Sequence, residues 1–148
     1  MKSARRRSRE LTMRALYQWS ATGYNAPLIL KQFTEDPLYV KADKAYFEKL
    51  FNGVLDEVGK IDTALEPHLD RPLEELSPIE LAILRLGAFE LGYLLDVPYR
   101  VVINEAVELA KEYGGTDGFK YVNGVLDKLA QVTRAIEVAA NARRPAQE

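Results

Sequence analysis

The segment from Ser77 to Leu95 constrains the fold most, because a helix here would be apolar on two faces. A specific helix start is supplied by Ser77 as N-cap, Pro78 in the first turn and Glu80 at the third helical position. One stripe comprises Ile79, Ala82, Ile83, Leu86, Phe89 and Tyr93, and the other comprises Leu81, Leu84, Ala88, Leu91 and Leu95. Both faces must be covered. We therefore expect a central helix, packed by its own subdomain on one side and by the other subdomain, or a partner, on the second.

Helical periodicity recurs along the rest of the chain, and strand alternation is almost absent. The predicted helices cover about residues 3–22, 27–34, 41–58, 61–69, 77–95, 98–113 and 117 to beyond 129. The breaks between them fall at Gly23, Asp36-Pro37, Gly59, Arg71-Pro72 and Gly114-Gly115. The sequence thus predicts an all-α fold of about seven helices in two packed subdomains, about residues 1–70 and 73–140, with a disordered tail over 141–148.

Composition excludes several classes of protein. The 148 residues contain no cysteine, which excludes disulfides, a thiolate nucleophile and a Cys-rich zinc site and fits a reducing, cytoplasmic compartment. The longest mostly apolar stretch, residues 79–97, is interrupted by four charged residues, Glu80, Arg85, Glu90 and Asp96. Their cost in a bilayer argues against a membrane span.

Catalytic and metal-binding patterns are weak. The one histidine, His68, has no serine or cysteine nucleophile arranged around it, and a single histidine without thiols is a poor start for a metal site. Glu90 projects towards the apolar stripe of the central helix; a buried carboxylate can be a general acid, but one that pairs with an arginine or caps backbone groups is commoner. Gly114-Gly115 lacks the lysine of a phosphate-binding loop. We expect a non-enzyme with no catalytic residue, metal or cofactor.

Cationic residues are concentrated at the start of the chain. The first nine positions contain Lys2, Arg5, Arg6, Arg7 and Arg9. Residues 1–14 carry a formal charge of about +5, because Arg14 adds a sixth cation and Glu10 is the one acidic residue. The whole chain carries −2, so the remaining residues carry about −7. This local excess indicates a surface that attracts nucleic acid, although a merely solvated charge run is the alternative.

Helical geometry places an aromatic ring on the same face as arginines. The core stripe of the helix predicted over residues 3–22 consists of Leu11, Ala15 and Trp19. At about 100° per residue, Tyr17 lies almost directly above Arg6, with Met13 and Arg9 nearby and away from that stripe. Single-stranded RNA is bound by phosphate contacts from cations and by stacking of bases on aromatic rings, so this face fits RNA. The alternative is that Tyr17 covers the edge of the core.

Four segments occur in a specific order and spacing. They are the arginine-rich start followed by ALYQW, the central IELAILRLGAFEL, the run VPYRVVINEAVELAKEYG and the closing FKYVNGVLDKLA. Each alone is weak, but together, over about residues 3–133, they resemble the NusB family of bacterial transcription antitermination factors. The resemblance implies an all-helical fold that binds the boxA sequence of ribosomal-RNA leader transcripts and pairs with NusE, a small-subunit ribosomal protein.

The resemblance also implies two RNA-contact regions. The family's RNA-binding start is matched by Arg5, Arg6, Arg7 and Arg9, with Lys2 just ahead and Tyr17 at the matching aromatic position. Its second region, at the start of the last helix, is matched by Asp117, Lys120, Asn123 and Gly124, while Tyr121 replaces a phenylalanine and keeps the ring. Gly118-Phe119 departs from the family's Ser–His pair and removes an N-cap hydroxyl, for which Asp117 can substitute.

For the partner surface, the resemblance points to acidic residues near the start of the central helix. Glu80 matches a position that the family uses towards NusE, and Glu74 and Glu75 lie just upstream. Glu80 also suits a capping role, because carboxylates in the first turn favour the helix dipole. The implied assembly joins RNA, NusE and elongating RNA polymerase, and some family members form homodimers.

Two alternatives remain at this stage. One is the RNA-binding domain of an rRNA cytosine methyltransferase, which resembles the same family but precedes a catalytic domain for which the chain has no room. The other is a generic helical adaptor between proteins, in which the arginine run is only a solvated tail.

Overall fold

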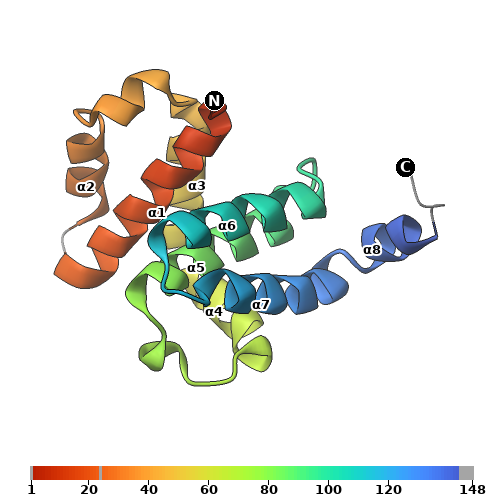
Figure 1. Cartoon of the computed structure of the whole chain (residues 1–148). Helices are drawn as coiled ribbons and strands as arrows, with labels where there is room; N and C mark the ends of the chain where they lie inside the picture. Colours follow the sequence, from red (N-terminus) through yellow and green to blue (C-terminus); the bar gives the residue numbers. More distant parts are fainter. Residues whose placement is uncertain (1, 24, 144–148) are drawn as a thin grey trace.

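The chain is built from helices throughout the parts that this computed structural model describes, residues 2–23 and 25–143. Within them there are eight α-helices, three short 3-10 helices and no strand (Figure 1). The α-helices are α1 (Ala4–Thr22), α2 (Ala26–Phe33), α3 (Lys44–Asp56), α4 (Val58–Leu65), α5 (Pro78–Tyr93), α6 (Tyr99–Tyr113), α7 (Gly118–Thr133) and α8 (Ala135–Ala142). The 3-10 helices are η1 (Pro37–Lys41), η2 (Glu66–His68) and η3 (Leu73–Glu75). The all-α prediction is confirmed, with slightly more helices than expected.

Helix α5 is the central helix. It packs against α1, α3 and α4 on one side and against α6 and α7 on the other, which covers both of its apolar faces. Its close approach to α3 depends on Gly53, because a Cβ atom there would overlap the Phe89 ring. The second face is therefore covered within the chain.

Helix α1 is more deeply buried than its sequence pattern predicts. Leu11 and Ala15 are in the core as expected, but Met13 and Arg9 are buried too, and Trp19 is only partly buried. The reason is that α1 contacts α2, α3, α5 and α6, so its buried arc is much wider than one stripe. Placing Met13 and Arg9 on an exposed face was wrong.

Several helix ends differ from their predicted positions. Helix α3 begins at Lys44 and not near residue 41, because residues 37–41 form η1 and the side chain of Asp43 caps α3 by accepting from the backbone N–H of Tyr46. The pattern predicted through Val58 is divided, since α3 ends at Asp56 and Val58 begins α4. Helix α5 ends at Tyr93, which leaves Leu95 exposed.

Two predicted caps have the right position but not the predicted hydrogen bond. Ser77 stands at the N-cap of α5 and Asp117 at that of α7, yet neither side chain makes a capping hydrogen bond. Glu80 instead lies against the start of α7, where a Cβ atom on Gly118 would be 3.4 Å from its Cδ atom. The capping box expected from Ser77 and Glu80 is therefore not formed.

The C-terminal part contains a helix that the sequence did not separate. Arg134 separates α7 from α8 and is buried. Its guanidinium group donates to the carbonyl oxygens of Glu90, Leu91 and Leu94 at the end of α5. Glu137 pairs with Arg134 at 2.6 Å and accepts from the backbone N–H of Tyr99 at the start of α6. Residues 141 and 142 belong to α8, so the predicted disordered tail is wrong there, and residues 144–148 lie outside the described part. Among the described helices, none is long and apolar enough to cross a bilayer.

Candidate nucleic-acid interface

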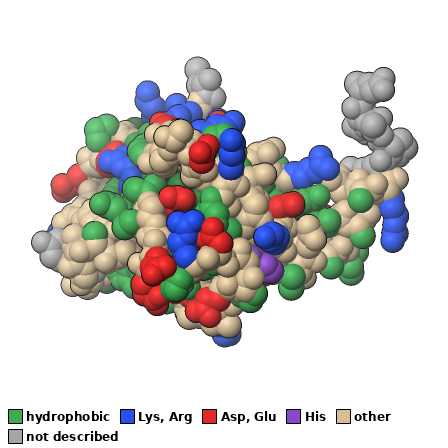
Figure 2. All heavy atoms as spheres, turned by 60° about the horizontal axis from the view of Figure 1, so that its bottom comes forward, with side chains coloured by type: hydrophobic (Ala, Val, Ile, Leu, Met, Phe, Trp, Pro, Cys, Tyr) green, Lys and Arg blue, Asp and Glu red, His purple; other side chains and the backbone are tan. Residues whose placement is uncertain are grey.

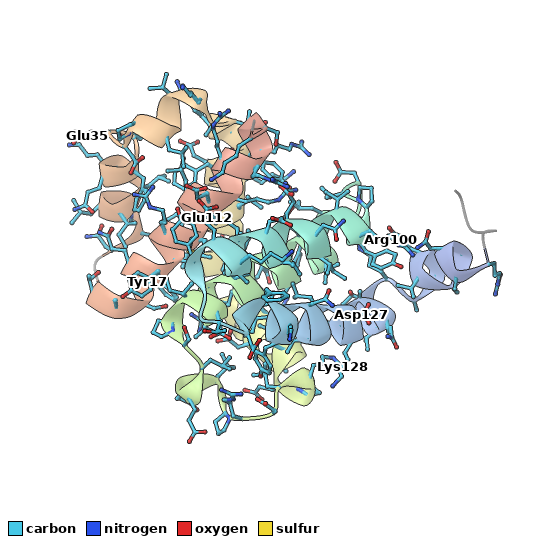
Figure 3. The ribbon with its side chains drawn as sticks, in the orientation of Figure 1. Tyr17, Glu35, Arg100, Glu112, Asp127 and Lys128 are labelled. Atoms are coloured by element: carbon cyan, nitrogen blue, oxygen red, sulfur yellow. The ribbon has the colours of Figure 1, made fainter. Side chains whose placement is uncertain are left out.

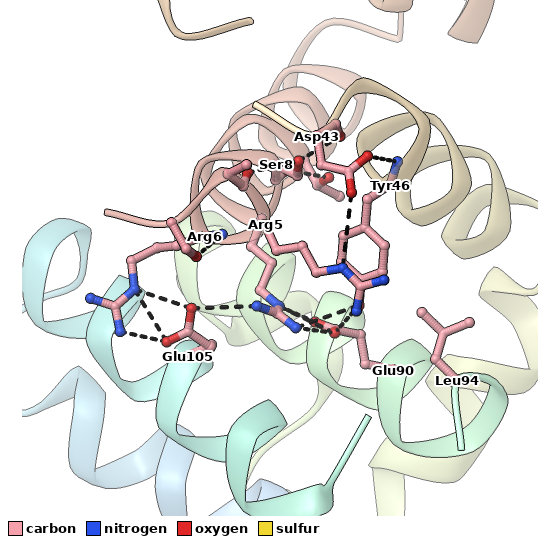
Figure 4. A network of polar contacts seen from close by, with 12 residues as sticks. Arg5, Arg6, Ser8, Asp43, Tyr46, Glu90, Leu94 and Glu105 are labelled. Carbon is pink, nitrogen blue, oxygen red and sulfur yellow. Dashed lines mark hydrogen bonds and ion pairs between the residues drawn. The ribbon is translucent and has the colours of Figure 1, made fainter. Parts of the chain in front are cut away.

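The cationic start of the chain is organised by the first turns of α1. Ser3 is the N-cap, and its Oγ accepts from the backbone N–H of Arg6 at 3.0 Å. The helix then directs Arg5 towards the N-cap of α3 and Arg6 towards α6 (Figure 4), and it directs Arg9 towards α5. One run of similar residues therefore acquires several distinct environments.

Arg9 is the buried member of this run. Its side chain is 5% exposed, and its Nε and Nη2 atoms donate to the carboxylate of Glu90 at 2.9 and 2.8 Å. Tyr46 on α3 donates its hydroxyl to the same carboxylate at 2.6 Å. Burial alone would lower the pKa of Arg9, but hydrogen bonding to Glu90 and the charges of Glu90 and Glu105 together outweigh burial and raise that pKa. The donors of Arg9 are therefore engaged by carboxylates of the protein, and Glu90 is an arginine partner, the commoner of its two expected roles.

The other cations of the run are more exposed but mostly paired. Lys2 contacts Glu10 and Glu112 at 2.7 and 3.0 Å, and Arg6 contacts Glu105 at 2.5 Å. The hydrogen bonds to Glu105 raise the pKa of Arg6. Arg5 lies 4.0 Å from Asp43 and stacks on Tyr46, with its Cζ atom 4.2 Å from the ring centre.

The paired carboxylates cancel the positive charge predicted for this end. Five of the six cations of residues 1–14 pair with six carboxylates, those of Glu10, Asp36, Asp43, Glu90, Glu105 and Glu112. Since five of those six carboxylates come from outside residues 1–14, the formal charge of the combined group is zero and not +5. In the described ranges, Arg7 alone among these six cations has no ion pair, which makes it the freest positive charge on the helix.

The second predicted region, at the start of α7, is open to solvent. Lys120 and Asp117 form a loose pair at 3.5 Å, with side chains 70% and 75% exposed, and Asn123 is exposed as well. Tyr121 is only partly exposed: the backbone N–H of Asp70 donates to its hydroxyl oxygen at 3.3 Å, and Arg71 lies over its ring at 5.1 Å. Burial raises the pKa of Tyr121. Its ring is thus engaged by the segment between η2 and η3.

The ring of Phe119, near Tyr121 in the sequence, lies close to two lysines and was not among the predicted site residues. The Nζ atoms of Lys111 and Lys120 lie 5.4 and 5.9 Å from the ring centre of Phe119. Lys111 also borders a groove of about 260 Å³ between α1 and α6, where Lys2 and Arg6 lie together with four glutamates, Glu10, Glu105, Glu108 and Glu112. The two predicted RNA regions are therefore connected across the end of α6. The sequence did offer one sign of this ring, because Phe119 stands where the family has a histidine.

Tyr17 and the predicted partner residues lie away from this groove. Tyr17 is 40% exposed on the second half of α1 (Figure 3). Glu74 and Glu75 are exposed on η3, at the lower edge of Figure 1, while Glu80 is half-buried against α7. Figure 2 shows acidic side chains interspersed with basic and hydrophobic ones on the lower face of the molecule. Tyr17, Glu74 and Glu75 are therefore accessible to a macromolecule, whereas Glu80 is partly buried.

Comparison with known proteins assigns the family. A family model described as "NusB family" matches residues 6–131, most of the chain. The chain belongs to the NusB family. A curated NusB relative, the transcription antitermination protein NusB of Alcanivorax borkumensis, is 55% identical over 143 residues, covering 97% of this chain and 94% of the relative. The NusB of Nitrosomonas europaea is 52% identical over 137 residues, covering 93% and 82%.

Solved NusB structures have the same fold. The NusB of T. maritima superimposes with a TM-score of 0.77 at 32% identity, covering 88% of this chain and 93% of that one. A chain from a crystal structure of NusB and NusE in complex with double-stranded RNA gives a TM-score of 0.78 at 29% identity, covering 86% and 96%. The helical arrangement described above is therefore that of the NusB family.

Proposed function

We propose that this protein is a transcription antitermination factor that binds boxA-type RNA of ribosomal-RNA transcripts together with NusE and helps to assemble the antitermination complex on RNA polymerase. The observation that carries the proposal is family membership, supported by the likeness to a NusB chain whose structure contains NusE and RNA. The curated relatives matched over most of their own length are named as antitermination proteins, which favours this function over a methyltransferase domain. The proposal includes no enzymatic activity, no cofactor and a cytoplasmic location.

The proposed RNA surface runs from the start of α1 to the start of α7. Its cations are Lys2, Arg5, Arg6, Arg7 and Lys120, and its aromatic and polar members are Tyr17, Asp117, Tyr121 and Asn123. Arg9 supports this surface from within, because it is buried and its donors are engaged by Glu90 and Glu105. Cations would set the position of the RNA backbone, while base contacts would supply the preference for one sequence.

The proposed NusE surface is the acidic segment that contains Glu74, Glu75 and Glu80. It adjoins the RNA surface, since Glu80 packs against Gly118 and Tyr121 contacts the segment between η2 and η3. A partner docked there would lie within reach of RNA bound at the start of α7. This adjacency supports joint binding, in which each component strengthens a contact that is weak alone. The proposal also includes self-association into a homodimer.

Fluorescence anisotropy of a labelled boxA-type RNA tests the function. The titration is run with and without NusE and against a scrambled RNA of the same length, and we expect tighter binding to boxA that NusE strengthens. Replacing Arg5, Arg6 and Arg7 with alanine should weaken RNA binding at least 10-fold, because up to three phosphate contacts are lost. The matched control replaces three exposed lysines elsewhere, Lys31, Lys49 and Lys60, and should change affinity much less. Equal binding to both RNAs, unaffected by NusE, would contradict the proposal.

A further inference from the structure

A hollow of about 520 Å³ lies beside the start of α1 and is open to solvent. Among its lining residues are Ser3, Arg5 and Arg6 from the start of α1, Pro98 and Val101 from the start of α6, and Glu105 one turn further along α6. Two half-exposed guanidinium groups thus border one cavity. A phosphate group of RNA has the size to enter it and is attracted by these guanidinium groups, although Asp96 also lines the hollow and the carboxylate of Glu105 already holds Arg6.

That carboxylate binds Arg6 in the manner of a phosphate. Glu105 accepts from Arg6 Nε at 3.1 Å and from Arg6 Nη2 at 2.5 Å, so the pair is bidentate (Figure 4). Arginine forms the same two-pronged contact with carboxylate and phosphate oxygens. A phosphate and Glu105 therefore compete for the same edge of the guanidinium group.

The structure also makes an exchange of partners feasible. Arg6 is 38% exposed and can turn towards the hollow, whereas Glu105 is 12% exposed and would be costly to leave without a cation. Arg9 meets this need, because its Nη1 atom already lies 3.4 Å from Glu105 Oε1 while its other nitrogens hold Glu90. Glu105 would keep a positive partner after Arg6 has moved.

We propose that Glu105 is an intramolecular competitor for RNA: a phosphodiester group enters the hollow beside α1, Arg6 exchanges Glu105 for that phosphate, and Glu105 stays paired with Arg9. The inference rests on the proposed function, since it concerns the same RNA surface. Its consequence is discrimination. Every RNA must displace Glu105 before it gains Arg6, so phosphate contacts alone bind weakly and base contacts decide which RNA is retained.

The substitution Glu105→Gln tests this exchange, because it keeps the shape of the side chain and removes its charge. Affinity is measured by anisotropy for a boxA-type RNA and for an RNA of unrelated sequence, between 50 and 200 mM salt. We expect binding of both RNAs to tighten about 3- to 10-fold and the slope of log affinity against log salt to steepen by about 0.7, as one further phosphate contact gives. In an Arg6→Ala background the substitution should change affinity by less than about 2-fold, the size of a general charge effect.

The matched control is Glu108→Gln on the same helix. It removes the same charge three residues further on, from a half-exposed glutamate whose ion pair is with Lys111 at 3.7 Å and not with an arginine of α1. Its effect should stay below about 2-fold, the size of an exposed charge contribution. Equal gains for both variants would show a general charge effect and overturn the exchange. Weaker binding by Glu105→Gln would overturn it too, since Glu105 would then orient Arg6 for RNA.

Two further readouts keep the result interpretable. Thermal unfolding verifies that Glu105→Gln is folded; if it is not, Glu105→Asp retracts the carboxylate from Arg6 while keeping a charge near Arg9 and should give a smaller gain in affinity. Failure of the two proposals can be told apart. If the unaltered protein shows no preference for boxA, the antitermination function is contradicted. A gain in affinity of Glu105→Gln for unrelated RNA would still support the role of Glu105. A clear boxA preference without any gain contradicts that role alone.

Discussion

The start of α1 and the start of α7 are both proposed to contact RNA, but they hold their cations in opposite ways. At α1, carboxylates from several elements pair with the arginines, and one arginine is wholly enclosed between helices. At α7, Lys120 has a loose neighbour, Asp117, at the N-cap of the same helix, and its side chain is 70% exposed. The difference teaches that cations serve packing at the start of α1, whereas Lys120 at the start of α7 is left open for the proposed contact with RNA. Substitution of the enclosed arginine at the start of α1 should therefore change mainly the stability of the fold, and substitution of Lys120 at the start of α7 mainly the affinity for RNA.

The largest effect is expected from Arg9→Ala, which tests whether the α1 region is structural. Removing this arginine leaves the buried carboxylate of Glu90 without its main partner, and such a loss costs about 3–5 kcal/mol. Chemical denaturation measures the change. The control is Arg7→Ala, two residues earlier on the same helix, where we expect a change within about 0.5 kcal/mol. A cost for Arg9→Ala below about 1 kcal/mol would mean that Glu90 reaches water and that the two regions differ less than proposed.

A smaller effect is expected from pH, at a residue that lies between the two regions. Tyr113, at the end of α6, donates its hydroxyl to Glu10 on α1 at 2.9 Å. Burial, and then the hydrogen bond to Glu10, raises the pKa of Tyr113 to about 12, from about 10 in the unfolded chain. The folded state then keeps a proton that the unfolded state releases, so this contribution to stability is complete below about pH 10 and is lost as the pH rises towards 12.

Comparison of the unaltered protein with Tyr113→Phe isolates this contribution from the other tyrosines. We expect the free energy of unfolding of the unaltered protein to fall more steeply above pH 10 than that of the variant. Parallel curves would show that Tyr113 ionises at an ordinary pKa and that its link to α1 is weak.

The smallest change in stability is expected from Lys120→Ala at the start of α7. Exposed pairs at this spacing contribute a few tenths of a kcal/mol, so unfolding should shift by less than about 0.5 kcal/mol. RNA affinity should still fall about 3-fold, with a salt slope shallower by about 0.7 if one phosphate contact is lost. Lys128→Ala, further along α7, is the control for RNA binding. A stability loss above 1 kcal/mol would remove the contrast between the regions.

Local features of the fold could be predicted from the sequence because they depend on neighbours in the chain. Gly23 ends α1 with a φ of 69°, a conformation that glycine adopts without strain, and Pro78 stands in the first turn of α5. The two apolar stripes of α5 predicted a helix covered on both sides, and its neighbours in space confirm this prediction. The short helix α8 was missed, because its boundary is set by Arg134 bonding to the distant end of α5.

The candidate site was less predictable, because its charges are decided by contacts across the chain. Arg9 and Glu90 are 81 positions apart, and Arg6 and Glu105 are 99 positions apart. A helical projection of α1 cannot identify either partner, because Glu90 and Glu105 lie on other helices. The list of cations was therefore available from the sequence, whereas their neutralisation and the burial of Arg9 required the fold. At α7 the cation Lys120 is exposed as a local pattern would suggest, but the engagement of Tyr121 by Asp70 and Arg71 was again a long-range contact.

Glu90 is bound from both ends of the chain at once. Its carboxylate accepts from Arg9 in the second turn of α1, and its backbone carbonyl accepts from Arg134 just before α8. Opening the second turn of α1 would leave a buried anion, and releasing Arg134 would leave the last carbonyls of α5 without a donor. The second turn of α1 and the end of α5 should therefore open together, and their amide protons should exchange with solvent in the same slow event. Among its described residues, helix α8 beyond Arg134 has no buried one, so its amide protons should exchange faster.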